Sequence, residues 1–265
     1  MSERVGFEVS ERVAEVWLNR PEKLNALDLE LLEGLVAVGE QLGARADVRA
    51  VVLRGEGRSF SAGLDFMSFA ALGEGAQARM FEREGSPANR AQRAAWIWRE
   101  LEVPVVAALQ GHVFGGGLQI ALGADLRIAA PDAQLSIMEI AWGLVPDMSG
   151  TRSLLGLVRT DVLCELVFSG RVLGAAEAAQ LGLVTRVADD PLAAARELAR
   201  QIAAQSPDAI AFGKQLIHRA RELDHAAGLE LEATLQRRLI GSTNQLEAVT
   251  AKLSKRAPEF RDRER

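Results

Sequence analysis

Two short apolar segments each lead into a glycine-containing loop. Val48–Leu53 is followed by Ser61-Ala62-Gly63, and Val103–Leu109 is followed by Gly115-Gly116-Gly117. Helical or loop sequence comes after each of them. This succession predicts an α/β body with buried strands, in which repeated strand–strand–helix units are one topology that fits.

The rest of the chain supports the same class. Val5–Val9 and Val13–Leu18 predict a hairpin, and apolar residues at helical spacing from Leu27 to Leu42 predict a helix capped by Asp28. Residues 67–94 are weakly periodic and predict a mobile loop with partial helix. From Pro191 the pattern is almost purely helical. We expect an α/β core over 1–190 and a helical C-terminal region over 191–265.

Charge and composition exclude several classes of protein. The chain has 31 Lys and Arg against 36 Asp and Glu, a net charge of −5, so no basic surplus favours nucleic acid or an anionic membrane. We find no signal peptide and no apolar run long enough to span a membrane. The single cysteine, Cys164, precludes an intrachain disulfide, and we expect a buried hydrophobe there. The cytoplasm is the expected compartment.

The three histidines show no metal-ligand spacing, so no metal site is predicted. His218 and His225 are expected at the surface, and His112 in a structural role. The chain also lacks a P-loop, a G-x-G-x-x-G run and a G-x-S-x-G nucleophile elbow.

The glycine triplet allows two interpretations. Three glycines let a ligand approach the backbone, and free N–H groups at a helix start attract negative charge. Two such groups aimed at one point would form an oxyanion hole. Tight packing of a strand against a helix explains the triplet equally well.

Two carboxylates stand in apolar surroundings. Glu139 lies in Ser136-Ile137-Met138-Glu139-Ile140, and Asp147 follows Leu144-Val145-Pro146. Apolar surroundings raise the pKa of a carboxyl group, which suits proton transfer. The alternative is that each acid sits at a rim with its carboxylate in water.

Four motifs in order resemble the crotonase superfamily, the enoyl-CoA hydratase/isomerase family. They are Asn19-Arg20-Pro21-Glu22-Lys23-Leu24-Asn25-Ala26-Leu27, Phe60-Ser61-Ala62-Gly63-Leu64-Asp65, Gly111 to Gly117, and Gly143-Leu144-Val145-Pro146 with Gly150-Thr151. The resemblance covers nearly the whole chain. It implies a spiral of ββα units with a helical C-terminal trimerisation region, and therefore a homotrimer or a dimer of trimers.

The resemblance also implies an acyl-CoA thioester substrate, with coenzyme A as part of the substrate and no further cofactor. By position, the N–H groups of Ala62 and Gly116 match the oxyanion hole, and Glu139 matches a catalytic glutamate. Substrate contacts are implied for two groups of residues. The first lines the acyl-CoA channel: Lys23, Leu24, Ala26, Ser61, Gly63, Asp65, Phe66, Gly115 and Gln119. The second, Lys214 and Phe260, meets the nucleotide end, which can lie on a neighbouring subunit.

One position departs from the family pattern. A family hydratase holds water with two glutamates, and the second position is Gln119 here, which cannot exchange a proton at neutral pH. Glu139 and Asp147 instead resemble the acid pair of Δ3,5-Δ2,4-dienoyl-CoA isomerase, although that enzyme also carries an acid at the position of Gln119. We therefore expect double-bond isomerisation of an unsaturated acyl-CoA. The alternatives are hydration of a 2-trans-enoyl-CoA, a non-catalytic acyl-CoA-binding protein, and hydrolase or decarboxylase chemistry.

Overall fold

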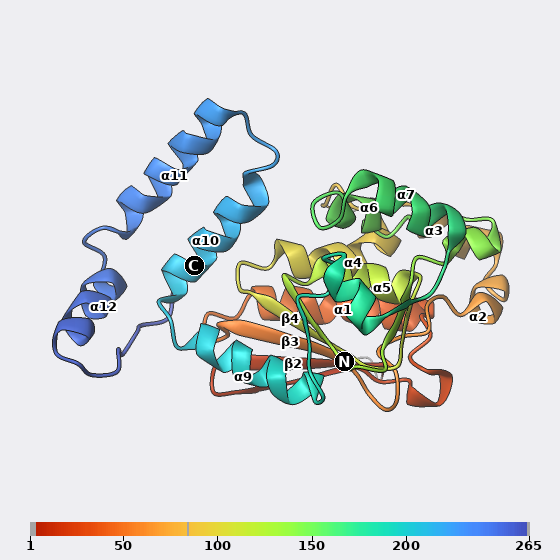
Figure 1. Cartoon of the computed structure of the whole chain (residues 1–265), viewed down its shortest axis with the longest axis horizontal. Coiled ribbons are helices and arrows are strands. Elements are labelled where there is room, and N and C mark those ends of the chain that lie inside the picture. The colour runs from red at the N-terminus through yellow and green to blue at the C-terminus, as the bar shows by residue number, and fades with distance from the viewer. Residues whose placement is uncertain (1–3, 84, 264–265) are drawn as a thin grey trace.

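The computed structural model describes residues 4–83 and 85–263. A six-stranded sheet in the order β1-β2-β3-β4-β6-β9 forms its centre (Figure 1), and a second, three-stranded sheet has the order β5-β7-β8. In the large sheet only β1 and β2 pair antiparallel. The strands are β1 (Val5–Ser10), β2 (Val13–Leu18), β3 (Ala50–Gly55), β4 (Val105–Leu109), β5 (His112–Phe114), β6 (Leu126–Ala129), β7 (Gln134–Ser136), β8 (Leu173–Gly174) and β9 (Arg186–Val187).

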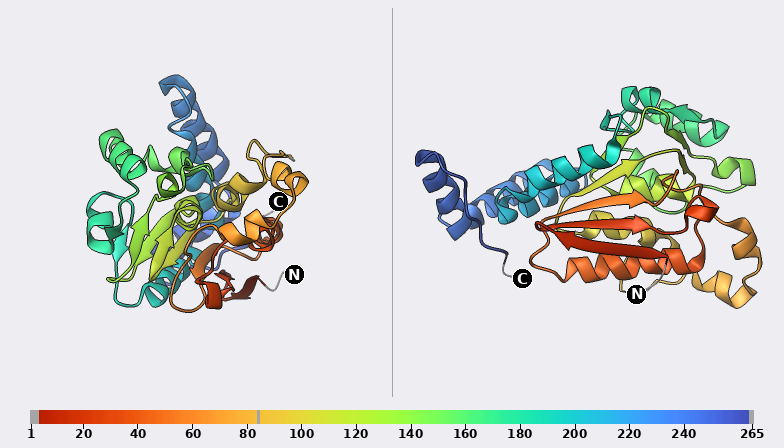
Figure 2. Two further views of the ribbon diagram at one scale, coloured as in Figure 1. Left: turned by 90° about the vertical axis from the view of Figure 1, so that its right-hand side faces the viewer. Right: turned by 90° about the horizontal axis from the view of Figure 1, so that it is seen from below.

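Both faces of the large sheet are buried. In β3, Val51 and Leu53 belong to the main hydrophobic core, whereas Ala50 and Val52 belong to a second cluster on the opposite face. Helix α9 (Pro191–Ala203) covers that second face and packs on β3, β4 and β6 (Figure 2). Burial on both sides explains why the strand segments are continuously apolar.

Helices α1 (Leu29–Gly43), α4 (Arg90–Glu100) and α5 (Gly116–Gly123) pack on one another in the main core. The predicted hairpin and the predicted cap are confirmed, since the Asp28 side chain accepts a hydrogen bond from the N–H of Leu31 at 2.9 Å. The remaining short elements of the body are η1 (Pro21–Lys23), α2 (Phe66–Ala70), α3 (Glu74–Arg79), η2 (Glu139–Trp142), α6 (Gly150–Leu154), α7 (Thr160–Ser169) and α8 (Ala175–Gln180).

The partial helix predicted within 67–94 is confirmed by α2, α3 and the start of α4, and Asp65 and Asn89 cap α2 and α4. Other sequence predictions need correction. The run 111–117 holds strand β5 as well as the turn. Cys164 is only half-buried, and His218 is partly buried because its Nε2 lies 2.9 Å from Asp125 Oδ1.

The C-terminal helices project from the body. Helices α10 (Pro207–Arg219), α11 (His225–Leu239) and α12 (Thr243–Leu253) extend to one side in Figure 1, whereas α9 stays on the sheet. The projecting part therefore begins at α10. The division into two regions at residue 190 stays a prediction.

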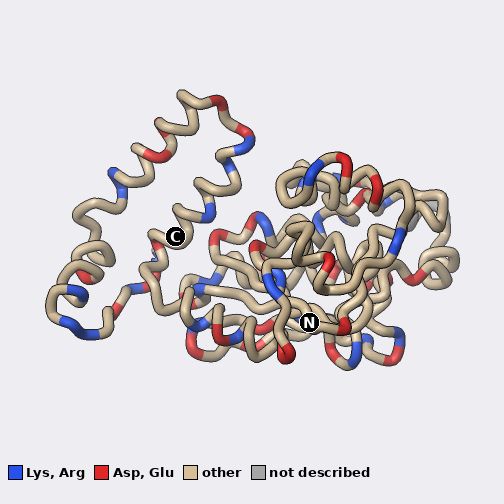
Figure 3. The backbone as a smooth tube through the Cα atoms, in the orientation of Figure 1, with Lys and Arg blue, Asp and Glu red and all other residues tan. Residues whose placement is uncertain are grey.

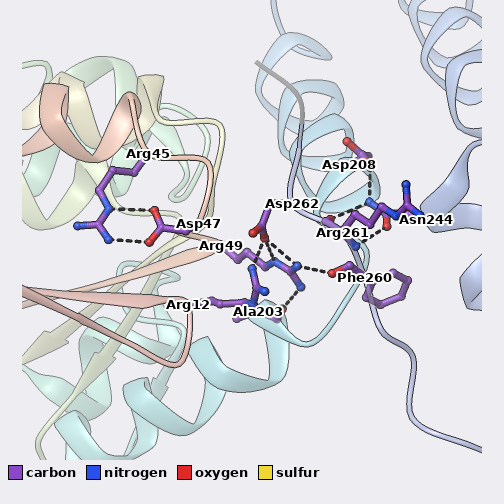
Figure 4. A network of polar contacts seen from close by, with 10 residues as sticks. All are labelled: Arg12, Arg45, Asp47, Arg49, Ala203, Asp208, Asn244, Phe260, Arg261 and Asp262. Carbon is purple, nitrogen blue, oxygen red and sulfur yellow. Dashed lines mark hydrogen bonds and ion pairs between the residues drawn. The ribbon is translucent and has the colours of Figure 1, made fainter.

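The final segment returns to the body after α12 (Figure 4). Arg49, at the start of β3, donates hydrogen bonds to the backbone oxygen of Phe260 at 2.7 Å and to Asp262 at 2.9 Å. Arg12 contacts the same carboxylate. Asn244 on α12 bonds Asp208 at the start of α10, at 2.7 Å. The contacts of Arg12 and Arg49 tie the final segment to the ends of strands in the large sheet, and Asn244 ties α12 to α10.

Acidic and basic residues are interspersed over the body and the projecting helices (Figure 3). Within the described residues, no helix is long and apolar enough to cross a membrane. The same part of the chain contains no group of three or more His, Cys, Asp or Glu placed to hold a metal ion.

Candidate active site

A cavity of about 190 Å³ lies where the start of α5 meets the loop after β3 and the segment around η2. Most of its lining is apolar, and two acids, Glu139 and Asp147, line it as well. The full lining is Ala62, Gly63, Leu64, Phe66, Gly115, Gly116, Gln119, Met138, Glu139, Trp142, Leu144, Val145, Asp147 and Met148. The structure thus brings the two predicted loops and the two predicted acids together.

The glycine triplet supplies a backbone donor. Gly116 is the first residue of α5, so its N–H has no partner within the helix. Gly115 precedes it with a φ of 49°, which a side chain would strain. A Cβ on Gly117 would lie 2.6 Å from the Cβ of Ser61. The triplet therefore packs tightly and also leaves an N–H at the cavity, while its part in an oxyanion hole stays a prediction.

The prediction that the N–H of Ala62 is the second donor is wrong. Its N–H donates to the backbone oxygen of Leu24 at 2.9 Å and is not available to a ligand. Two residues later, Leu64 lines the cavity, and its N–H has no partner within the described part of the chain. The turn at Gly63, with a φ of 89°, separates the bonded N–H from the free one.

Ser61 supports this loop from beneath. Its buried Oγ donates to the backbone oxygen of Asn25 at 2.8 Å and accepts from the N–H of Gly63 at 3.2 Å. Ser61 does not line the cavity, so the predicted substrate contact is replaced by a structural role. Gly63 does line it.

Glu139 and Gln119 form a buried pair. Gln119 Nε2 donates to Glu139 Oε1 at 2.6 Å. The other amide atom, Oε1, accepts from the N–H groups of Met148 at 2.8 Å and Gly150 at 3.0 Å. Glu139 Oε2 is buried and has no hydrogen-bond partner in the described structure.

Burial raises the pKa of Glu139, and the nearby charge of Asp147 adds to the rise. Hydrogen bonds from its own backbone N–H and from Gln119 act in the opposite direction. Asp147 sits at the rim, exposed to solvent, yet partial desolvation also raises the pKa of its carboxyl group. Carboxyl groups with raised pKa values suit proton transfer near neutral pH.

Phe66 and Asp65 have different roles. Phe66 lines the cavity and packs on Trp142, with ring centroids 4.2 Å apart. Asp65 caps α2 through the N–H and hydroxyl of Ser68, which, with Arg20 at 2.8 Å, lower its pKa to about 2. Its carboxylate is therefore engaged within the protein, contrary to the predicted substrate contact.

The segment 23–26 forms the wall behind these loops and does not line the cavity. Leu24 and Ala26 offer backbone oxygens to Ala62 and Arg20, and the Lys23 side chain is exposed. Sequence reasoning missed Asn25, whose buried amide bonds the backbone of Glu56 and Ser59 at 2.9 and 2.8 Å. Its place within the first motif was the available signal.

Lys214 and Phe260 lie outside this cavity. Lys214 Nζ is buried and contacts three oxygens: Asp125 Oδ2 at 2.8 Å, and the backbone oxygens of Trp98 and Val103 at 3.1 and 3.0 Å. Its three N–H donors are thus used, so the predicted contact with the nucleotide end is wrong in this structure. Phe260 lies on the final segment beside Arg49, so a contact with substrate stays a prediction for a neighbouring subunit.

Known proteins share both the sequence and the fold. Residues 8–263 match the family model for enoyl-CoA hydratase/isomerase. A probable enoyl-CoA hydratase of Bacillus subtilis is 33% identical over 260 residues, covering 97% of this chain and 98% of the relative. A short-chain-enoyl-CoA hydratase of Clostridium acetobutylicum is 33% identical over 256 residues, covering 95% of each.

Solved structures agree. An enoyl-CoA hydratase from Bacillus anthracis superimposes with a TM-score of 0.90 at 30% identity, covering 97% of this chain and 98% of the other. A putative enoyl-CoA hydratase from Streptomyces coelicolor gives 0.91 at 30% identity, covering 99% and 96%. The mixed α/β fold described above is therefore the crotonase fold, and the chain belongs to the enoyl-CoA hydratase/isomerase family.

Proposed function

We propose that this protein isomerises a double bond of an unsaturated acyl-CoA through an enolate, with Glu139 and Asp147 as the two proton carriers. The observation that carries the proposal is the identity of the neighbour of Glu139. That neighbour is an amide, Gln119, whereas the second acid of the cavity is Asp147 on the following loop.

The proposed reaction conserves all atoms of the substrate. One carboxylate removes a proton from the saturated carbon α to the thioester carbonyl, and the electron pair moves toward the carbonyl oxygen. The N–H groups of Leu64 and Gly116 would donate to that oxygen and stabilise its charge. The other acid returns a proton at the far end of the conjugated system, which shifts the double bond. The apolar lining keeps water from competing.

Two ultraviolet assays on the purified protein test the proposal. A 3,5-dienoyl-CoA should gain 2,4-dienoyl absorbance, and both Glu139→Gln and Asp147→Asn should lower this turnover by about 10²–10⁴. The parallel assay follows loss of conjugation in a 2-trans-enoyl-CoA. Hydration that survives Asp147→Asn would overturn the isomerase proposal.

Hydration is the second candidate, and the names of the relatives favour it. In this case Glu139 would act on a water that Gln119 orients. Gln119→Glu should then raise hydration strongly, and an unchanged rate would contradict the idea. A protein that binds acyl-CoA and turns over neither thioester would instead be a binding protein.

A further inference from the structure

We propose that Gln119 is a positioning residue that restricts Glu139 to a single working oxygen, Oε2, and aligns it with the loop carrying Asp147. This inference rests on the proposed function for its catalytic consequence. Its structural basis is independent of which thioester is the substrate.

The orientation of the Gln119 amide follows from chemistry. Two backbone N–H groups, of Met148 and Gly150, point at one amide atom, at 2.8 and 3.0 Å. Only the amide oxygen can accept from them, so the NH₂ group must face Glu139. The 2.6 Å contact with Glu139 Oε1 is thus a donated hydrogen bond that favours the ionised carboxylate.

This contact makes the two oxygens of Glu139 unequal. Oε1 is held by the amide, whereas Oε2 is buried and lacks a partner within residues 4–83 and 85–263. An oxygen without a donor is the better proton acceptor, so transfer occurs at Oε2. Gln119 has no proton to exchange, and its own oxygen is already used.

The same side chain holds the loop that carries Asp147. Ser149 adopts a φ of 65°, which is unfavourable for a residue with a side chain. The bonds from Met148 and Gly150 to Gln119 lie on either side of it. A Cβ on Gly150 would lie 2.7 Å from Gln119 Oε1, which explains the glycine there. One amide therefore fixes both acids relative to each other.

The first test is the pH dependence of kcat/KM for dienoyl turnover in Gln119→Met and Gln119→Glu. Removing the donor, or placing a carboxylate beside Glu139, should move the rising limb about one pH unit higher and cut the rate at pH values below the limb about 10-fold. Gln119→Glu keeps an acceptor for Met148 and Gly150, so it retains the loop contacts that Gln119→Met loses.

Gln110→Met is the matched control. The Gln110 amide likewise bonds two backbone groups, donating to the oxygens of Gly55 at 2.8 Å and Gly57 at 3.2 Å, but neither Glu139 nor Asp147 contacts it. In the pH profile of kcat/KM for Gln110→Met, the rising limb should stay at the wild-type position. If both Gln119 variants also keep the wild-type limb, Gln119 is merely structural and the inference is wrong.

A second measurement does not depend on activity. Burying an ionised Glu139 costs stability, and without Gln119 the cost is larger. The melting temperature of Gln119→Met should therefore fall further below wild type as pH rises through the pKa of Glu139. This pH-dependent part of the difference in melting temperature should vanish when Gln119→Met is combined with Glu139→Gln. If it persists there, Gln119 does not act through Glu139. If wild type turns over neither thioester while the pH-dependent part vanishes as expected, the proposed function fails and the positioning role stands.

Discussion

Burial of Glu139 has opposite effects on chemistry and on stability. It raises the pKa of the carboxyl group, which brings a carboxylate base into the useful range. A raised pKa also means that the folded state prefers the protonated form. The protonated Glu139 therefore makes a favourable contribution to folding stability at low pH, and this contribution is lost as pH rises through the pKa of Glu139 in the folded state.

Glu139→Gln should separate these effects. The amide carries no charge to desolvate, so we expect the variant to melt at a higher temperature than wild type above the pKa of Glu139, and to match it more closely at low pH. Turnover should fall by about 10²–10⁴. Calorimetry across pH and the ultraviolet assay measure the two results. Glu8 is exposed, so Glu8→Gln is the control. If the difference in melting temperature between Glu139→Gln and wild type is the same at every pH, the role given to burial is wrong.

At the scale of elements, the start of α5 brings a backbone N–H to the cavity. A Cβ on Gly116 would lie 2.8 Å from Leu27 Cδ1 and 2.9 Å from Met148 Sδ. Both side chains are buried, so either they or the start of α5 must shift to admit the Cβ, which displaces the N–H.

Gly116→Ala should therefore lower kcat/KM by up to about 10²–10³, the cost of losing one oxyanion donor, and lower the unfolding free energy by about 1–3 kcal/mol. Gly228→Ala in α11 is the control, because no atom lies within 4 Å of its Cβ. It should leave kinetics unchanged and raise stability by about 0.5–1 kcal/mol. If Gly116→Ala keeps the wild-type kcat/KM, Gly116 is not a donor of the oxyanion hole.

The link between α10 and the sheet depends on a buried ion pair. Lys214 on α10 contacts Asp125, which precedes β6, and the backbone oxygens of Trp98 in α4 and Val103 before β4. Desolvation lowers the pKa of Lys214, and the negative charge of Asp125 opposes this.

Lys214→Met should cost about 3–5 kcal/mol of unfolding free energy, because it leaves Asp125 buried without its main partner. The KM for acyl-CoA should not change, since Lys214 lies outside the cavity. Denaturant unfolding measures the loss of unfolding free energy, and steady-state kinetics measure the KM. A raised KM with normal stability would restore the predicted contact with the nucleotide end.

For the whole molecule, the projecting helices expose apolar side chains. Residues such as Ile217 on α10, Leu229 on α11 and Leu253 on α12 are each more than half exposed. Apolar surface on a projecting hairpin favours contact with other subunits. We therefore propose a homo-oligomer held by α10–α12, for which the family resemblance implies a trimer or a dimer of trimers.

Light scattering after gel filtration should give three or six times the 28.6 kDa chain mass. Combining Leu229→Glu with Leu253→Glu should shift the mass to 28.6 kDa, because the charges cannot be desolvated at an interface. The exposed charge change Glu8→Lys on β1 should leave the mass unchanged. A monomeric wild type would contradict the proposal.

Local patterns in the sequence determined much of this protein. The apolar strands, the Asp28 cap, the glycine triplet and the two acids were all predicted, because each depends on residues near one another in the chain. Ordered motifs gave the family, and with it the crotonase fold.

Only the tertiary structure decided which groups are free to act. Ala62 and Leu64 are two residues apart, yet the N–H of Ala62 donates to the backbone oxygen of Leu24, whereas the N–H of Leu64 has no partner in the described part of the chain. The three donors of Lys214 are taken by Asp125, Trp98 and Val103, and the Asp65 carboxylate by Arg20 and Ser68. Gln119 joins Glu139 to the Asp147 loop across 20 and 29 residues. Sequence specifies which donors and acceptors exist, but distant backbone atoms decide which remain unpaired, and those unpaired groups are the ones to which we assign the proposed chemistry.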